Sequence, residues 1–249
     1  MSFFGDTLSS LPFIFVATLS WFSFQITSHF LSRSLFPKTY NSLEKKKQTQ
    51  WNIRVVSLIH SVIVSLSCLY LLVESELSNE RVFGHSHSAS IIFTISCSYF
   101  LWDTLVTLYN FQDFGFGFLI HGVSCFLIYF FVFKPLFMYY GLCFLLYEMS
   151  TPFLNINWFF DKFQMTGTIP QLFNGIILVL TFGFIRLIFG FFISLQFYLS
   201  VFEVLDQVEP FFIALYSIAN IVLNSLNVYW FTLMIPSVIA RFSSPKKVE

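Results

Sequence analysis

Long apolar stretches separated by short polar segments run along the whole chain. A helix needs about 20 mostly apolar residues to cross about 30 Å of hydrocarbon, and a backbone in lipid must satisfy its own hydrogen bonds. The pattern therefore predicts an all-α fold, a polytopic membrane helical bundle of about seven transmembrane helices. These helices are expected at 11–32, 53–74, 89–109, 116–133, 136–154, 171–195 and 210–240.

Two features of this pattern bear on the number of spans. Only Lys134-Pro135 separates the fourth and fifth stretches, so the pattern is compatible with two full spans or with a re-entrant hairpin over 116–154. The first stretch is preceded only by Asp6 and contains Gln25 and His29. We therefore expect it to remain a membrane helix rather than to be removed as a signal peptide.

Composition supports burial in a membrane. The chain has 249 residues, of which 56% are hydrophobic and only 10% are charged, whereas soluble domains carry about 25% charged residues. The formal net charge is zero, so no global field favours nucleic acid as a partner. The four cysteines lie inside apolar stretches without metal-ligand spacing, so we expect neither disulfides, nor a bound metal, nor a cofactor.

The charged loops predict an orientation, because basic loops stay on the cytosolic side of a membrane. With seven spans, the N-terminus is then lumenal and the C-terminus cytosolic. Lys246 and Lys247 form a dilysine sequence, KKVE, of the kind that retrieves membrane proteins to the endoplasmic reticulum. The basic loop between the first two spans contains Arg33, Lys38, Lys45, Lys46, Lys47 and Arg54.

Ionisable side chains inside a bilayer cost several kcal/mol, so they usually face the interior of the bundle and have partners. Counted along the expected spans, four of the five lie about 8–11 Å below the cytosolic boundary. Such a layer fits either a proton- or acyl-transfer site or pairing between helices. The five are His60, Asp103, His121, Glu148 and Arg186, of which Arg186 lies deeper.

A polar stripe on the last span supports an interior face. Asn220, Asn224 and Asn227 recur at a spacing that keeps them on one side of a helix. We expect them, with His60, Glu148 and Arg186, to line a lipid-binding or polar cavity. His121, with Asp103 and Glu148, is expected to line a polar cavity that opens toward the cytosolic side. Packing between helices is the alternative reading of the same stripe.

Several short motifs carry a family resemblance. They are Trp51-Asn52-x-Arg54 with His60-Ser61, Tyr99-Phe-x-Trp102-Asp103, the single His121, and Glu148-x-Ser-Thr-Pro-Phe-x-Asn155-x-x-Trp158. Together they resemble the TLC-domain family, which includes the ceramide synthases. The likeness is to the small members of the TLC domain-containing protein 4 type. It implies a helical bundle in the endoplasmic reticulum or related membranes, with a role in lipid metabolism or lipid sensing.

The chain departs from the ceramide synthases at the position where they carry two adjacent histidines. Here the pair is His121-Gly122, and their acidic stretch is replaced by residues 147–151. The resemblance divides the chain into a first helix with a basic loop (1–44), a TLC-like transmembrane domain (45–245) and a dilysine tail (246–249).

Three functions are compatible with these residues. The first is a multi-pass protein of lipid homeostasis that binds or regulates membrane lipids. The second is an acyltransferase of the ceramide-synthase type, with acyl-CoA or a sphingolipid as partner. In that case His121 takes the proton or the acyl group and Asp103 orients the imidazole. The third is a cargo receptor or transporter. The oligomeric state is not indicated by the sequence.

Overall fold

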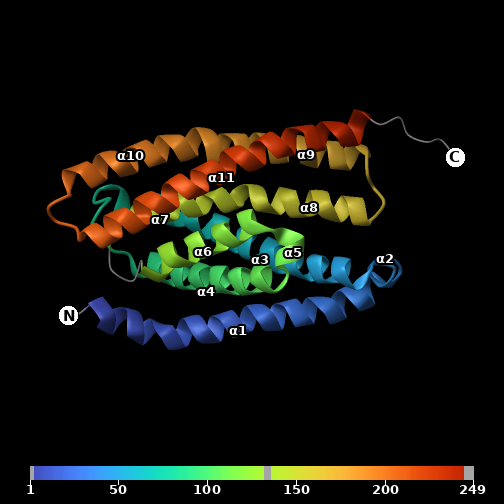
Figure 1. The fold of residues 1–249 in the computed structure, drawn as a ribbon, viewed down its shortest axis with the longest axis horizontal. Coiled ribbons are helices and arrows are strands. Elements are labelled where there is room, and N and C mark those ends of the chain that lie inside the picture. Colours follow the sequence, from blue (N-terminus) through green and yellow to red (C-terminus); the bar gives the residue numbers. More distant parts are fainter. Residues whose placement is uncertain (1–2, 132–135, 244–249) are drawn as a thin grey trace.

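The structure is a computed structural model that describes residues 3–131 and 136–243, and every element in these two ranges is helical (Figure 1). Thus Lys134-Pro135, Lys246 and Lys247 lie outside the described residues. The elements are α1 (Phe3–Leu35), α2 (Pro37–Asn41), α3 (Lys45–Glu74), η1 (Glu76–Ser78), α4 (His87–Tyr109), α5 (Phe111–Phe114), α6 (Phe116–Phe131), α7 (Met138–Leu145), η2 (Leu146–Ser150), α8 (Thr151–Lys162), α9 (Ile169–Thr181), η3 (Phe182–Phe189), α10 (Gly190–Glu203) and α11 (Pro210–Ser243).

Among the described residues, five helical stretches are long and apolar enough to cross a membrane. Two further rods complete the bundle: α6 runs back along α4, and α7, η2 and α8 follow one another without a break (Figure 1). The structure thereby confirms the predicted all-α polytopic bundle. The five long stretches are Leu11–Leu35, Lys45–Glu74, His87–Tyr109, Ile169–Glu203 and Pro210–Arg241.

The region predicted as 116–154 differs in length from the prediction. Within the described residues its first helix, α6, spans 16 residues, or about 24 Å. Its second rod continues past 154 to Lys162. The continuation is possible because Pro152 lies at the start of α8, where its missing N–H removes no helical hydrogen bond.

The distribution of side chains is that of a protein in lipid. Large apolar side chains cover the outside, and among them Val73 is 82% exposed and Phe173 67%. Polar groups lie inside instead, with Arg186 only 6% exposed and His60 fully buried. Lipid solvates the apolar exterior, whereas the polar groups avoid it by facing one another.

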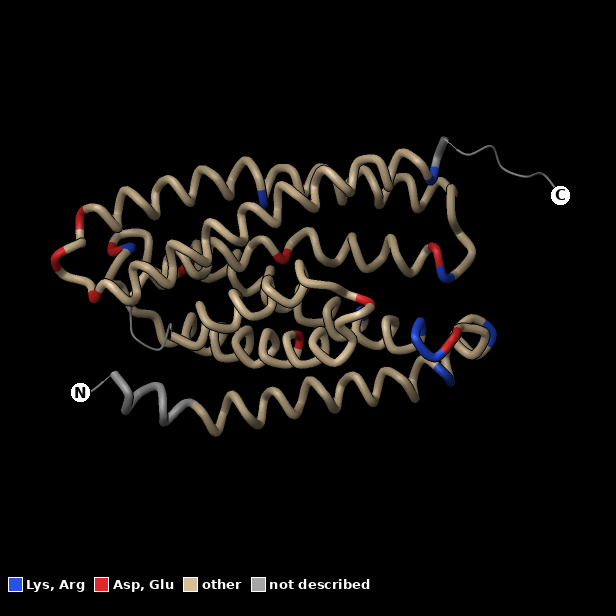
Figure 2. The backbone as a smooth tube through the Cα atoms, in the orientation of Figure 1, with Lys and Arg blue, Asp and Glu red and all other residues tan. Residues whose placement is uncertain are grey.

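Charged residues gather at the two ends of the bundle (Figure 2). We call the end formed by α2, the start of α3 and the ends of α8 and α11 the basic end, after Lys38, Lys45 and Arg241. The opposite end, formed by η1, the end of α10 and the start of α11, is the acidic end, after residues such as Glu76 and Glu203. The start of α1 and the end of α11 also lie at opposite ends of the bundle (Figure 1).

At the basic end, two acidic side chains of the described residues form ion pairs with basic ones. Arg241 Nη2 lies 3.0 Å from Asp161 Oδ2, which joins the ends of α11 and α8. Lys46 pairs with Asp113 and so joins the start of α3 to the segment between α4 and α6. These contacts hold the loops of the basic end against each other.

Candidate functional site

A cavity lies inside the bundle, between α4 and α6 on one side and the 136–148 segment, η3, α10 and α11 on the other. The cavity has a volume of about 60 Å³. Most of its wall is apolar or aromatic, and the polar groups are concentrated in one part. The apolar and aromatic lining residues are Phe100, Cys125, Ile128, Tyr129, Leu136, Phe137, Tyr140, Gly141, Phe144, Leu145, Tyr147, Phe197, Tyr216 and Leu223.

Six of the eight residues proposed from the sequence line this cavity together: His121, Glu148, Arg186, Asn220, Asn224 and Asn227. They come from four separate helical elements, so only the fold brings them into one place. His60 and Asp103 are not among the lining residues. The lining runs from the middle of the bundle to the acidic end, where Phe137 and Tyr216 lie, and not toward the basic end as expected.

Arg186 is the centre of the polar part. It lies in η3, a π-helical segment, and its Nε donates to the carbonyl oxygen of Tyr147 at 2.9 Å and to Ser150 Oγ at 3.0 Å. Its Nη2 lies 3.6 Å from Glu148 Oε1. Its Nη1 donates to Asn227 Oδ1 at 3.1 Å. One guanidinium therefore links η2 and α11 and compensates the buried carboxylate.

The local structure of η2 makes these contacts possible. Residues 146–150 form a 3₁₀ segment between α7 and α8, which turns Tyr147 and Glu148 toward η3. The Tyr147 hydroxyl donates to Asn224 Oδ1 at 3.3 Å. Its oxygen lies only 2.5 Å from the place where a Cβ on Gly190 would be. Glycine at 190 is therefore required for Tyr147 to reach the asparagine stripe.

The asparagine stripe of α11 is held by Ser194 of α10. Asn220 Nδ2 and Asn224 Nδ2 donate to Ser194 Oγ at 3.0 and 2.9 Å, and Asn224 Nδ2 also donates to Asn220 Oδ1. Asn227 differs, because its Nδ2 is buried without a hydrogen-bond partner. The sequence did not single out Ser194, since one serine in an apolar helix has no periodic signal.

His121 faces the cavity beside Cys125, whose Sγ lies 3.9 Å from both ring nitrogens. Trp230 packs edge-on against its ring at 5.4 Å between centroids. Among the described residues, the ring forms no hydrogen bond with Asp103 or Glu148, so the orienting bond from Asp103 that we expected is not formed. The arrangement leaves the imidazole accessible from the cavity.

Asp103 lies beside Gly122 on the neighbouring helix. A Cβ on Gly122 would be 2.8 Å from Thr104 Oγ1, 3.3 Å from Asp103 Oδ2 and 3.4 Å from the Thr104 Cα. The close approach of α4 and α6 thus leaves no room for a second imidazole after His121. The departure from the paired histidines of the ceramide synthases is part of this packing.

We expect Gly122→Ala to lower the free energy of unfolding by about 1–3 kcal/mol, because the added methyl group overpacks the α4–α6 contact. Gly117→Ala on the same helix is the matched control, since its Cβ would meet only Leu226 Cδ2 at 3.8 Å. Thermal unfolding of both variants in detergent measures the difference. Equal midpoints would contradict the close packing.

His60 is separate from the cavity. Its ring stacks on Tyr99 with 3.6 Å between centroids and an interplanar angle of 7°. Phe100 packs against His60 on one side and His121 on the other, at 5.7 and 6.1 Å. The two imidazoles therefore do not meet, and both nitrogens of His60 are buried without a hydrogen-bond partner.

Motif residues of α3 and α8 meet at a second place, where these two helices pack on each other. Arg54 Nη1 donates to Asn155 Oδ1 at 3.0 Å, and the guanidinium lies over the Trp158 ring at 5.0 Å. Asn155 Nδ2 donates in turn to Ser57 Oγ at 3.1 Å. Trp51 is buried beside Trp158, at 6.2 Å between ring centroids. These motif residues fasten two helices and do not line the cavity.

Comparison with known proteins identifies the domain that forms this bundle. Residues 50–236 match the family model described as the TLC domain, and this range falls inside the TLC-like region expected at 45–245. An uncharacterized TLC domain-containing protein of Schizosaccharomyces pombe is 34% identical, over 94% of this chain and 80% of that protein.

Two further relatives carry different names. Topoisomerase I damage affected protein 4 of Saccharomyces cerevisiae is 29% identical, over 86% of this chain and 78% of that protein. Human TLC domain-containing protein 4 is 31% identical, over 70% of this chain and 69% of that protein. The similarity therefore extends over most of the bundle, including the segments that line the cavity.

Proposed function

Because this chain belongs to the TLC-domain family of membrane proteins, we propose that it binds a membrane lipid in its internal cavity and acts in lipid homeostasis. The family membership agrees with the resemblance indicated by the motif residues. The observation that carries the proposal is the cavity itself. Its wall is mostly apolar and aromatic, and one part holds a compensated pair, Arg186 and Glu148, beside three asparagines.

This arrangement suits a lipid for physical reasons. Small-molecule sites are usually concave and mostly apolar, with a few placed polar groups that fix the orientation of the ligand. The aromatic part near Phe137, Phe144 and Phe197 suits an acyl chain. The polar part suits the oxygen-bearing end of the same molecule, because hydrogen-bonding groups at this depth have no competing water.

Filling the cavity tests this function. Leu223 lines the cavity, whereas Ile221 on the same helix is 59% exposed on the outside of the bundle. We expect Leu223→Trp to lower the amount of lipid that co-purifies with the protein by about tenfold, because the indole occupies the space of the ligand. Mass spectrometry of lipids extracted from the purified variants measures it.

Ile221→Trp is the matched control and should retain the bound lipid, since the same indole there projects into the bilayer. Equal lipid content in both variants, with the same midpoint of thermal unfolding, would mean that the cavity does not hold the ligand. A constant cellular lipid profile combined with altered secretory cargo on loss of the protein would instead support the cargo-receptor reading.

Acyl transfer is the second candidate, and the position of His121 on the cavity wall favours it. A lipid acyl group in the cavity would lie against this imidazole, which has no carboxylate bonded to it among the described residues. The proposed role is that of a base or of the atom that accepts the acyl group. Glu148 forms an ion pair with Arg186, so it would contribute to the reaction only through the charge balance of the site.

His121→Ala separates the two candidates. If the protein transfers acyl groups, the variant should lose the cellular lipid change while its abundance and its bound lipid stay the same. If His121 only packs against Trp230, loss of the lipid change should follow loss of abundance, and His121→Asn should partly restore both. Lipid profiles normalised to the amount of protein distinguish these results. The proposed location in the endoplasmic reticulum remains a prediction from Lys246 and Lys247.

A further inference from the structure

We infer that the bound lipid carries an uncharged oxygen acceptor, such as an ester or amide carbonyl, that accepts a hydrogen bond from Asn227, with its chain directed toward Tyr216. This inference rests on the proposed function, because it names the chemical class of the lipid that the same cavity binds. Three observations carry it: a free donor at Asn227, the charge balance beside it, and the spread of the lining residues along α11.

The free donor has a defined identity. Asn227 is 2% exposed and lines the cavity. Arg186 is able only to donate, so the atom of Asn227 that it contacts at 3.1 Å must be the amide oxygen. The other atom is then Nδ2, which is buried and has no partner. A buried donor without a partner costs about 1–3 kcal/mol, so a ligand acceptor at this position is favoured.

The charges around Asn227 exclude a free anion as the better ligand. Arg186 lies 3.6 Å from Glu148 and donates its other hydrogen bonds to Tyr147, Ser150 and Thr151. The positive charge is therefore already compensated. A carboxylate or phosphate placed beside Asn227 would bring an unpaired charge into a site without water, which is far more costly than bringing in a carbonyl.

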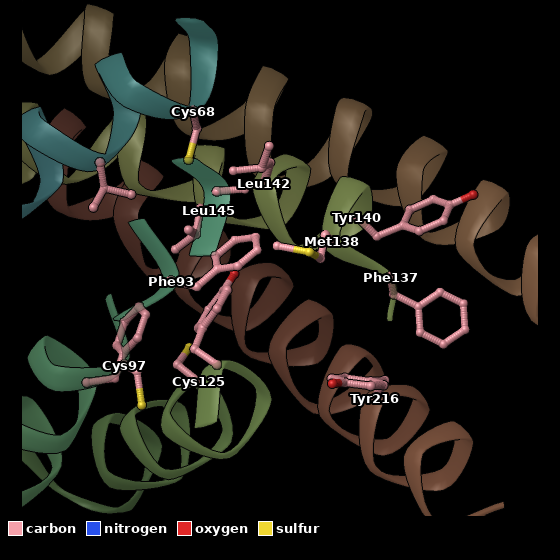
Figure 3. Close-up of a cluster of buried hydrophobic side chains, with 14 of the residues drawn as sticks. Cys68, Phe93, Cys97, Cys125, Phe137, Met138, Tyr140, Leu142, Leu145 and Tyr216 are labelled. Carbon is pink, nitrogen blue, oxygen red and sulfur yellow. The ribbon is translucent and has the colours of Figure 1, made fainter. Parts of the chain in front are cut away.

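The spread of the lining residues along α11 sets the direction of the chain. One face of α11 carries Tyr216, Asn220, Leu223 and Asn227. The interval of eleven residues from Tyr216 to Asn227 corresponds to about 16 Å along the helix axis. At the far end Tyr216 packs edge-on against Phe137, with 5.8 Å between centroids. Figure 3 shows Phe137, from the start of the α7 rod, near Tyr216 of α11. Lining residues spread along one helix face in this way suit an extended chain.

The Tyr216 hydroxyl is also buried without a partner and lies at the other end of the cavity. It therefore offers a matched comparison on the same helix. The inference places the oxygen of the lipid at Asn227 and only the chain at Tyr216, because polar neighbours able to orient an oxygen surround Asn227, whereas Phe137 and Phe212 surround Tyr216.

Competition among three ligands of equal chain length tests the inference. The purified full chain in detergent is labelled with a diazirine-bearing methyl palmitate, and hexadecane, methyl palmitate and palmitate compete at mildly alkaline pH. We expect methyl palmitate to compete about tenfold better than either of the others, the factor that one buried hydrogen bond contributes. If palmitate competes best, or if hexadecane equals the ester, the inference is wrong.

Two variants locate the donor. Asn227→Leu removes the donor without adding a charge, so the advantage of the ester over hexadecane should fall from about tenfold to about one. Tyr216→Phe should leave that advantage unchanged, and the opposite result for the two variants would place the oxygen of the lipid at Tyr216 and overturn the inference. If Asn227→Leu does not fold, the three ligands on the unchanged protein still decide. If none of the three competitors lowers the labelling, the cavity does not bind a lipid chain, and the result would contradict the proposed function.

Discussion

Arg186→Met should lower the free energy of unfolding by about 3–5 kcal/mol, the cost of leaving a buried carboxylate without its partner. The substitution removes the ion pair with Glu148 and frees the Tyr147 carbonyl and Asn227 Oδ1 inside the bundle. Loss of so much stability should appear as a much lower yield of folded protein and a lower midpoint of thermal unfolding in detergent.

A charge-balanced double variant gives the sharper result. Arg186→Met with Glu148→Gln removes both charges, so we expect it to recover part of the loss. Arg81→Met is the surface control, since Arg81 is exposed at the acidic end and lies over the Tyr139 ring at 5.1 Å. Its loss should be at most about 1 kcal/mol. If the double variant is no more stable than Arg186→Met, then Glu148 does not depend on the arginine for its charge balance.

Glycan acceptor sites inserted at the two ends of the bundle should give an all-or-none result. Basic loops stay cytosolic, so a flexible insert with an acceptor asparagine after Ser42, at the basic end, should remain unmodified. The same insert after Asn79, at the acidic end, should be glycosylated in microsomes, because N-glycans are added on the lumenal side. A mobility shift that glycosidase treatment removes measures the modification.

A second pair of inserts tests the number of passes. The loop between α8 and α9 lies at the basic end, and the loop between α10 and α11 lies at the acidic end (Figure 1). Only the insert in the second loop should be modified. The same modification state for both loops would contradict the crossing of the membrane by the Ile169–Glu203 stretch, and the reverse pattern at all four positions would invert the orientation.

The sequence by itself determined the helices and their separation from water. Backbone hydrogen bonds in lipid are satisfied within each helix, so a run of apolar residues is sufficient to specify a helix without knowledge of its neighbours. The same local reasoning located the charged loops, whose residues gather at opposite ends of the bundle. It also indicated that His121, Glu148 and Arg186 would face inward, because an ionisable group is costly in hydrocarbon wherever its helix packs.

The sequence did not determine where each helix begins and ends. Apolar periodicity did not show that α3 begins at Lys45 rather than at residue 53, or that α8 continues to Lys162. Polar residues extend a helix beyond the hydrocarbon without any hydropathy signal. The hydropathy pattern likewise did not reveal that Arg186 lies in a π-helical segment, since one extra residue in a turn leaves the composition of the stretch unchanged.

Only the tertiary structure decided which inward-facing groups meet. The sequence placed His60 and Asp103 in the same layer as His121, but the ring of Phe100 separates the two imidazoles, and Asp103 lies against Gly122. Contacts between helices depend on how each helix is rotated about its axis, and this rotation follows from packing over the whole bundle. For the same reason, nothing in the spacing of Asn220, Asn224 and Asn227 distinguishes the amide whose nitrogen is left free. That depends on Arg186 and Ser194, which both lie on the Ile169–Glu203 stretch.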